Sequence, residues 1–220
     1  MTAGDGQPAT MTRVDVLDTL APMLDEQDLL VTIPSARRHF REITRSIIGA
    51  EPAHNTFAPV VLGSISSTAL GLALAMPHRR IVALDTDGSI LMNTGILATM
   101  GNERSPNLTV VVLDNEVYES IGLHPTHTAG FTDLARMASG AGCVNCSTAR
   151  DVDSVADLVG KALDDGEFGF VVTKILPGHL PPEWGRPRIP GDTDGVEDKY
   201  RFIRHVQALE GIAIYDVRFW

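Results

Sequence analysis

The sequence contains little cysteine: its 220 residues include only Cys143 and Cys146, in the segment GCVNC. A single pair is too small to bind an iron–sulfur cluster within this chain. The evidence for a zinc site is weak, because no second cysteine pair and no histidine ligands accompany the two cysteines. A redox pair of the thioredoxin type would begin a helix after a strand, whereas these cysteines follow a helical segment. We therefore expect two small buried thiols.

Long apolar runs and clusters of basic residues are also missing. The longest apolar stretch, residues 69–76, contains a glycine and ends at Pro77, so it is too short to cross a membrane. Residues 1–13 lack the apolar core of a signal peptide. The formal net charge is −10, and residues 37–41 are the densest basic segment. We therefore expect a cytoplasmic protein that binds neither membranes nor nucleic acids.

Short apolar runs alternate with helical segments, which predicts an α/β fold with a doubly wound parallel sheet sandwiched by helices. The domain is expected over residues 12–176, after a disordered N-terminus at 1–11. Residues 177–220, rich in proline and glycine, are expected to form an extended C-terminal arm and a helix. Strands are predicted at 29–33, 58–62, 80–85, 108–113, 143–147 and 170–175, and helices at 12–24, 35–48, 68–76, 90–101, 132–140, 151–164 and 200–210.

Two common phosphate-binding motifs are absent, since the chain has neither a GxGxxG fingerprint after its first strand nor the GK[ST] of a P-loop. Instead, polar residues follow two predicted strands. Asp87, Gly88 and Ser89 come after one, and Asn115 comes after the next. Carboxyl ends of parallel strands share one edge of a sheet, where ligands bind. Carboxylate and amide oxygens suit Mg2+, and the N–H groups of a helix start suit a diphosphate. The alternative is that Asp87 caps its helix and Asn115 fills a turn.

The segment from Asp87 to Asn115 resembles the thiamine diphosphate motif, usually written GDG followed about two dozen residues later by NN. The chain is similar, over residues 14–212, to the diphosphate-binding (PP) domain of thiamine diphosphate-dependent 2-oxoacid decarboxylases. The likeness points especially to the sulfopyruvate decarboxylase β subunit and to phosphonopyruvate decarboxylase. It includes Gly63-Ser64-Ile65 and residues 89–95, 125–128 and 199–205.

The resemblance implies roles for the matching residues. Mg2+ would be bound by Asp87, the side chain of Asn115 and the carbonyl of Val117. The cofactor would contact these three residues and also Gly63, Ser64, Ile65, Gly88, Ser89 and Tyr118. Among them, the Gly63 carbonyl would accept a hydrogen bond from the 4′-amino group, and Ile65 would hold the two cofactor rings in their bent form.

The chain departs from the family pattern at three positions. Thr86 replaces the first glycine of GDG, Asp114 replaces the first asparagine of NN, and Ser66 stands where glycine is common. The expected metal ligands themselves are present. The departures bear on how tightly the cofactor binds.

Such enzymes also need a glutamate from a separate pyrimidine-binding domain. This chain has room for one domain, so we expect an alpha-type partner subunit to supply the glutamate in a hetero-oligomer. The small-residue helix 68–76 and residues 121–123 are expected to contribute to that interface.

The substrate would be a small anionic 2-oxoacid that loses CO2 to give an aldehyde. His127 and His124, after the metal-binding strand, are candidates for catalytic acid or base. Thr126 and Thr128 are candidates for contacting the anionic substrate, and His54 and Asn55 for facing the site. Two further interpretations stay open: a carboligase or acyl transferase with the same cofactor, and a non-catalytic cofactor-binding subunit.

Overall fold

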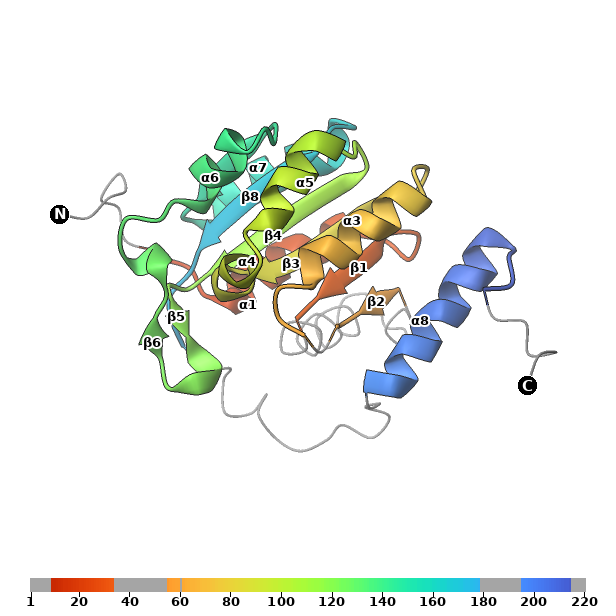
Figure 1. The fold of residues 1–220 in the computed structure, drawn as a ribbon, viewed down its shortest axis with the longest axis horizontal. Coiled ribbons are helices and arrows are strands. Elements are labelled where there is room, and N and C mark those ends of the chain that lie inside the picture. Colours follow the sequence, from red (N-terminus) through yellow and green to blue (C-terminus); the bar gives the residue numbers. More distant parts are fainter. Residues whose placement is uncertain (1–8, 34–54, 60, 179–194, 215–220) are drawn as a thin grey trace.

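The apolar runs of the sequence form the strands of one parallel sheet (Figure 1). The structure is a computed structural model and describes residues 9–33, 55–59, 61–178 and 195–214. Six strands pair in the order β2-β1-β3-β4-β8-β7, and every pair is parallel. Their bounds are β1 Leu29–Thr32, β2 Thr56–Phe57, β3 Ile81–Thr86, β4 Leu108–Asp114, β7 Cys146–Ala149 and β8 Gly169–Lys174.

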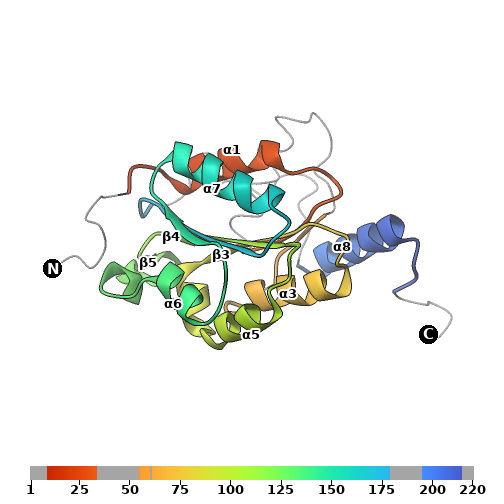
Figure 2. The ribbon, with the colours of Figure 1, turned by 90° about the horizontal axis from the view of Figure 1, so that it is seen from above.

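Helices cover both faces of this sheet (Figure 2). Helices α1 (Arg13–Leu20) and α7 (Val152–Asp164) lie on one face. The other face carries α3 (Ile65–Ala75), α4 (Asp87–Met92), α5 (Gly95–Glu103) and α6 (Leu134–Gly140). Short 3-10 helices occupy η1 Ala21–Met23, η2 Glu119–Ile121 and η3 His127–Ala129. The predicted α/β fold with a parallel sheet between helices is confirmed.

Burial on both faces explains why the central strands are continuously apolar. All seven residues of β4 are buried, as are five of the six residues of β3. A strand covered by helices on both sides has no solvent-facing side, so its sequence does not alternate between apolar and polar residues. Helix α7 shows the complementary pattern, because Val155, Val159 and Ala162 place one apolar stripe against the sheet.

The last helix, α8 (Gly195–Glu210), lies beside the sheet edge formed by β2. Its Phe202 ring packs on Phe57, with ring centroids 5.6 Å apart. Near its end, the Glu210 carboxylate accepts a hydrogen bond from Arg79 Nε at 2.6 Å. These contacts attach α8 to the domain, and the helix begins earlier than the predicted residue 200.

Several predicted elements differ in the structure, among them the strand predicted at 143–147, which is β7 at Cys146–Ala149. The strand expected at 58–62 is instead the short β2 at Thr56–Phe57, and Ala58 is buried without a strand partner. The helix expected at 90–101 is divided into α4 and α5 at Asn93, whose backbone leaves the helical region. The predicted helix 35–48 lies outside the described residues.

Cys146 begins the edge strand β7, and Cys143 lies in the turn before it. Cys143 is buried, and its thiol donates to the carbonyl of Leu97 at 3.5 Å. Cys146 is half-buried, and both thiols are free. The expectation of buried thiols is therefore confirmed for Cys143 and only partly met by Cys146. Within the described residues, no helix has both the length and the apolar character needed to cross a membrane.

Helix α5 packs closely on the turn after α6, and this contact yields a stability prediction. A Cβ atom at Gly101 would lie 2.1 Å from the carbonyl oxygen of Ala141, so Gly101→Ala must displace backbone. We expect it to lower the free energy of unfolding by about 1–3 kcal/mol, the usual range for overpacking. The measurement is urea-induced unfolding.

Gly160→Ala on α7 is the matched control, because a Cβ there meets no atom within 4 Å. It should stabilise the chain by about 0.5–1 kcal/mol through helix propensity. Equal effects of the two substitutions would contradict the close packing of α5.

Candidate functional site

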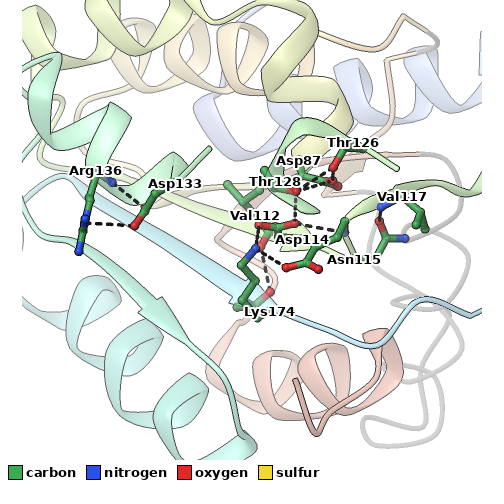
Figure 3. A network of polar contacts seen from close by, with 12 residues as sticks. Asp87, Val112, Asp114, Asn115, Val117, Thr126, Thr128, Asp133, Arg136 and Lys174 are labelled. Atoms are coloured by element: carbon green, nitrogen blue, oxygen red, sulfur yellow. Dashed lines mark hydrogen bonds and ion pairs between the residues drawn. The ribbon is translucent and has the colours of Figure 1, made fainter. Parts of the chain in front are cut away.

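The carboxyl ends of β3 and β4 bring three polar side chains to one edge of the sheet (Figure 3). The register pairs Thr86 with Leu113, so Asp87 and Asp114 follow directly on neighbouring strands. Asp87 and Asp114 are each 1% exposed, and Asn115 is 6% exposed. Buried polar groups need partners, so the contacts of these side chains define what the site can bind.

Two threonine hydroxyls hold the carboxylates. The Thr126 hydroxyl donates to Asp87 Oδ2 at 2.6 Å, and the Thr128 hydroxyl lies 2.7 Å from Asp114 Oδ1 and 3.2 Å from Asp87 Oδ2. Both threonines are 4% exposed. The prediction that these hydroxyls contact an anionic substrate is therefore wrong, because they are buried against Asp87 and Asp114.

The start of α4 tests whether Asp87 caps this helix. Thr86, not Asp87, is the N-cap of this helix: its hydroxyl accepts the N–H of Ser89 at 3.3 Å. The alternative in which Asp87 caps the helix is therefore wrong, and Thr86 has a structural reason to replace glycine. Asn115 does form a turn, since its Oδ1 accepts the N–H of Val117 at 3.1 Å.

Burial and the neighbouring Asp114 charge raise the pKa of Asp87 from 3.8 to about 6. Hydrogen bonds from Thr126, the Gly88 N–H and Thr128 oppose this shift of the Asp87 pKa. Burial also raises the pKa of Asp85, against hydrogen bonds from Ser66 and Ser89. A buried carboxylate that resists ionisation gains from a nearby cation, which favours its negatively charged form.

Gly63, in the loop before α3, makes two hydrogen bonds to α4 and its end, one as donor and one as acceptor. The Gly63 N–H donates to the Ser89 hydroxyl at 2.9 Å, and the Gly63 carbonyl accepts from Asn93 Nδ2 at 2.8 Å. Gly63 has a φ of +82°, a conformation that favours glycine. The predicted cofactor residues Gly63 and Ser89 thus lie in direct contact, although 26 positions separate them.

Ser66 is explained by a contact inside the domain. Its hydroxyl and its N–H donate to the buried carboxylate of Asp85, at 2.6 and 3.1 Å. Ile65, next to it, is completely buried and belongs to the core. Contact of Ile65 with a cofactor would therefore require part of this packing to open. Ser64 is half-buried, and its hydroxyl donates to the carbonyl of Val61.

A hairpin that the sequence did not predict follows β4. Strands β5 (Val117–Tyr118) and β6 (His124–Pro125) pair antiparallel, and the Tyr118 ring lies so close to Gly88 that a Cβ there would be 2.7 Å away. Glu119 anchors the hairpin through Arg13 at 2.7 Å and the N–H of Gly178 at 2.9 Å. The hairpin therefore carries Val117 and Tyr118 against the start of α4.

The predicted histidines lie on this hairpin and the turn after it, and both His124 and His127 are exposed. Asn55 lies elsewhere. Its side chain donates to the carbonyl of Asp28, just before the amino end of β1, so its expected place near the site is wrong. His54 lies outside the described residues.

Lys174 is the site residue that the sequence analysis missed. Its Nζ lies 2.7 Å from Asp114 Oδ2 and 2.8 Å from Glu116 Oε1. The register of β4 and β8 pairs Lys174 with Asp114. The sequence does contain a signal for this contact. A lysine near the end of the predicted strand 170–175 could pair with the aspartate at the end of a neighbouring strand.

The donor atoms of the predicted metal ligands fit a magnesium ion. The set of Asp87, Asn115 Oδ1 and the Val117 carbonyl contains only oxygen donors, which suits Mg2+ and not zinc or copper. Among the described residues, no three His, Cys, Asp or Glu side chains form a metal-binding group. A metal here would therefore depend on one carboxylate with amide and peptide oxygens, completed by other oxygens such as those of a diphosphate.

Comparison with known proteins identifies the family. Residues 46–173 match the family described as thiamine pyrophosphate enzyme, C-terminal TPP binding domain. The chain belongs to this family. The predicted resemblance is thereby confirmed, and thiamine diphosphate is the cofactor class of the domain. The family match covers both the Gly63 loop and the strand ends that carry Asp87 and Asn115.

Two relatives carry the names that the resemblance suggested. The sulfopyruvate decarboxylase subunit beta of Methanothermobacter thermautotrophicus is 31% identical over 198 residues, which cover 90% of this chain and 96% of the relative. The phosphonopyruvate decarboxylase of Streptomyces viridochromogenes is 36% identical over 128 residues, which cover 58% of this chain and 32% of the relative.

The fold is also that of known thiamine enzymes. The crystal structure of benzoylformate decarboxylase from Polynucleobacter necessarius superposes with a TM-score of 0.63 at 18% identity, over 82% of this chain and 36% of the other. At this identity the likeness concerns the fold alone.

The raised pKa of Asp87 predicts a pH dependence of stability in the metal-free chain. The folded state keeps the proton up to about pH 6, whereas the unfolded state releases it near its ordinary value of 3.8. Between these values the folded state binds more protons, so stability falls as the pH rises. The loss attributable to Asp87 is at most about 3 kcal/mol.

Urea unfolding at several pH values between about 4 and 7 measures this loss. Asp87→Asn should flatten the dependence, leaving the contribution of Asp85, whereas Asp157→Asn on the exposed side of α7 should not. If the free energy of unfolding depended on pH in the same way in the wild type and in Asp87→Asn, the raised pKa of Asp87 would be contradicted.

Proposed function

We propose that this chain is the diphosphate- and Mg2+-binding subunit of a thiamine diphosphate-dependent 2-oxoacid decarboxylase. The observation that carries the proposal is the buried carboxylate of Asp87 at the end of β3, beside Asn115 at the end of β4. Such an edge of a parallel sheet is where α/β folds bind ligands. The named decarboxylases among its relatives agree with this activity.

The residues of this chain would bind and orient the cofactor, and the cofactor itself would supply the chemistry of decarboxylation. Mg2+ would be bound by Asp87, Asn115 Oδ1 and the Val117 carbonyl. Gly88 and Ser89, at the start of α4, would face the diphosphate, with Tyr118 packed against Gly88. When bound, thiamine diphosphate supplies the electron sink for loss of CO2. The Gly63 loop, attached to Ser89 and Asn93, would orient the aminopyrimidine.

The substrate proposal follows from the relatives' names, sulfopyruvate and phosphonopyruvate decarboxylase. Both names describe a 2-oxoacid with a second anionic group, so we propose a small anionic 2-oxoacid here. His127 and His124 are exposed near the hairpin and are the candidates for proton transfer to the product.

The glutamate that such chemistry needs would come from a pyrimidine-binding domain outside this chain. The two glutamates after β4 are engaged: Glu116 pairs with Lys174, and Glu119 pairs with Arg13. The phosphonopyruvate decarboxylase relative is three times longer than its matched part, and the beta name of the other implies an alpha subunit. Exposed apolar side chains for docking a partner follow β2, end α4 and lie on the hairpin: Val61, Leu62, Met92, Ile121 and Leu123.

Cofactor binding tests the proposal directly. Asp87→Ala should weaken thiamine diphosphate binding in the presence of Mg2+ by at least about 100-fold, because loss of even an indirect metal contact costs about 10–100-fold. Isothermal titration calorimetry of the full chain measures this. Asp157→Ala, at an exposed position of α7, is the matched control. Full cofactor affinity in Asp87→Ala would refute the metal assignment.

Activity requires the partner. The chain co-purified with its pyrimidine-domain partner should release CO2 from at least one member of a panel of anionic 2-oxoacids, sulfopyruvate and phosphonopyruvate among them. Carbon–carbon bond formation without CO2 release as the end point would favour a carboligase. Cofactor binding by the assembled protein without turnover of any 2-oxoacid would favour the non-catalytic cofactor-binding subunit.

A further inference from the structure

Asp87 lies at the same buried edge of the sheet as a second carboxylate, Asp114. The hydroxyl groups that contact them carry too few hydrogens to stabilise two ionised carboxylates. Thr126 and Thr128 make four close contacts, three to the carboxylates and one to each other at 2.8 Å. Two hydroxyl groups carry only two protons. At least two of the four oxygen–oxygen contacts therefore lack a hydrogen when both carboxylates are ionised.

Lys174 provides the positive charge for one of the two carboxylates. Its side chain is 13% exposed and contacts Asp114 Oδ2, while Asp114 Oδ1 faces Thr128. Figure 3 shows Lys174, Asp114, Thr128 and Asp87 in succession. Within the described part of the chain, no lysine, arginine or histidine forms an ion pair with Asp87. Asp87 is thus the carboxylate left for a metal ion.

We propose that Lys174 is a positioning residue of the cofactor site, which holds Asp114 away from the metal and, through Asp114 and Thr128, orients Asp87. This inference rests on the proposed binding of Mg2+ and thiamine diphosphate. A released Asp114 would offer Mg2+ a second carboxylate and take a coordination position that a diphosphate oxygen needs. Two neighbouring negative charges would also repel the diphosphate.

Lys174→Met separates metal binding from cofactor binding. Calorimetry on the full chain would use MgCl2 alone and then thiamine diphosphate at saturating MgCl2. We expect cofactor affinity to fall by about tenfold or more, the scale of a lost indirect metal contact. Affinity for Mg2+ alone should be unchanged or higher, because the site becomes more negative. A purely structural lysine would lower the melting temperature without this split.

Removing the charge of Asp114 should make Lys174 dispensable. Asparagine has the shape of aspartate and still accepts from Thr128, so Asp114→Asn combined with Lys174→Met should return cofactor affinity to within a few-fold of wild type. Lys174→Arg should retain most of the affinity. Lys161→Met is the matched control, because Lys161 is exposed on α7 and its ion pair with Asp165 spans 4.0 Å; it should bind cofactor as the wild type does.

Each outcome decides the inference. Wild-type cofactor affinity in Lys174→Met, or no recovery in the double variant, overturns it. If Lys174→Met alone does not fold, the double variant and Lys174→Arg carry the test, and a folded double variant that cannot bind cofactor overturns the inference. A wild-type chain that binds neither Mg2+ nor thiamine diphosphate, alone or assembled with its pyrimidine-domain partner, refutes the proposed function itself, and the inference with it, which distinguishes the two failures.

Discussion

Two carboxylates buried side by side are the constraint on which the rest of this site depends. The parallel register of β3 and β4 makes Asp87 and Asp114 neighbours at the sheet edge, and helices on both faces keep water away. Burying a charge is costly unless it is paired or hydrogen-bonded. The Thr128 hydroxyl and Lys174 lower this cost for Asp114. The hydroxyls of Thr126 and Thr128 compensate Asp87 only in part, because burial still raises its pKa. A divalent cation would complete this compensation.

A second set of hydrogen bonds joins the loop before α3 to the same edge. Ser66 donates to Asp85 in β3, and Gly63 exchanges hydrogen bonds with Ser89 and Asn93 on and after α4. The break between α4 and α5 lies at Asn93, whose side chain donates to the Gly63 carbonyl. The residues proposed to bind a diphosphate and those proposed to orient an aminopyrimidine are thus joined by one set of hydrogen bonds.

The sequence predicts the parallel sheet because burial on both faces leaves a direct mark, an unbroken apolar run, as in β4. It also predicts that Asp87 and Asn115 share an edge, since that follows from strand order alone. The β5–β6 hairpin leaves no such mark, because His124 and Pro125 are exposed and Glu119 anchors it to the distant Arg13. The contacts of Thr128 and Lys174 with Asp114 likewise depend on pairings that arise only after folding.

The three departures from the family pattern each have a hydrogen-bond or ion-pair partner in the structure. Thr86 caps α4, Ser66 binds the carboxylate of Asp85, and Asp114 pairs with Lys174. Among the described residues, the buried side-chain atoms without a partner include none of these three. Random loss of function would leave polar substitutions at a buried edge unsatisfied, which is costly. Because each departure has its own partner, these polar residues are accommodated at the edge of the sheet, and this supports the proposal of cofactor binding over a vestigial role.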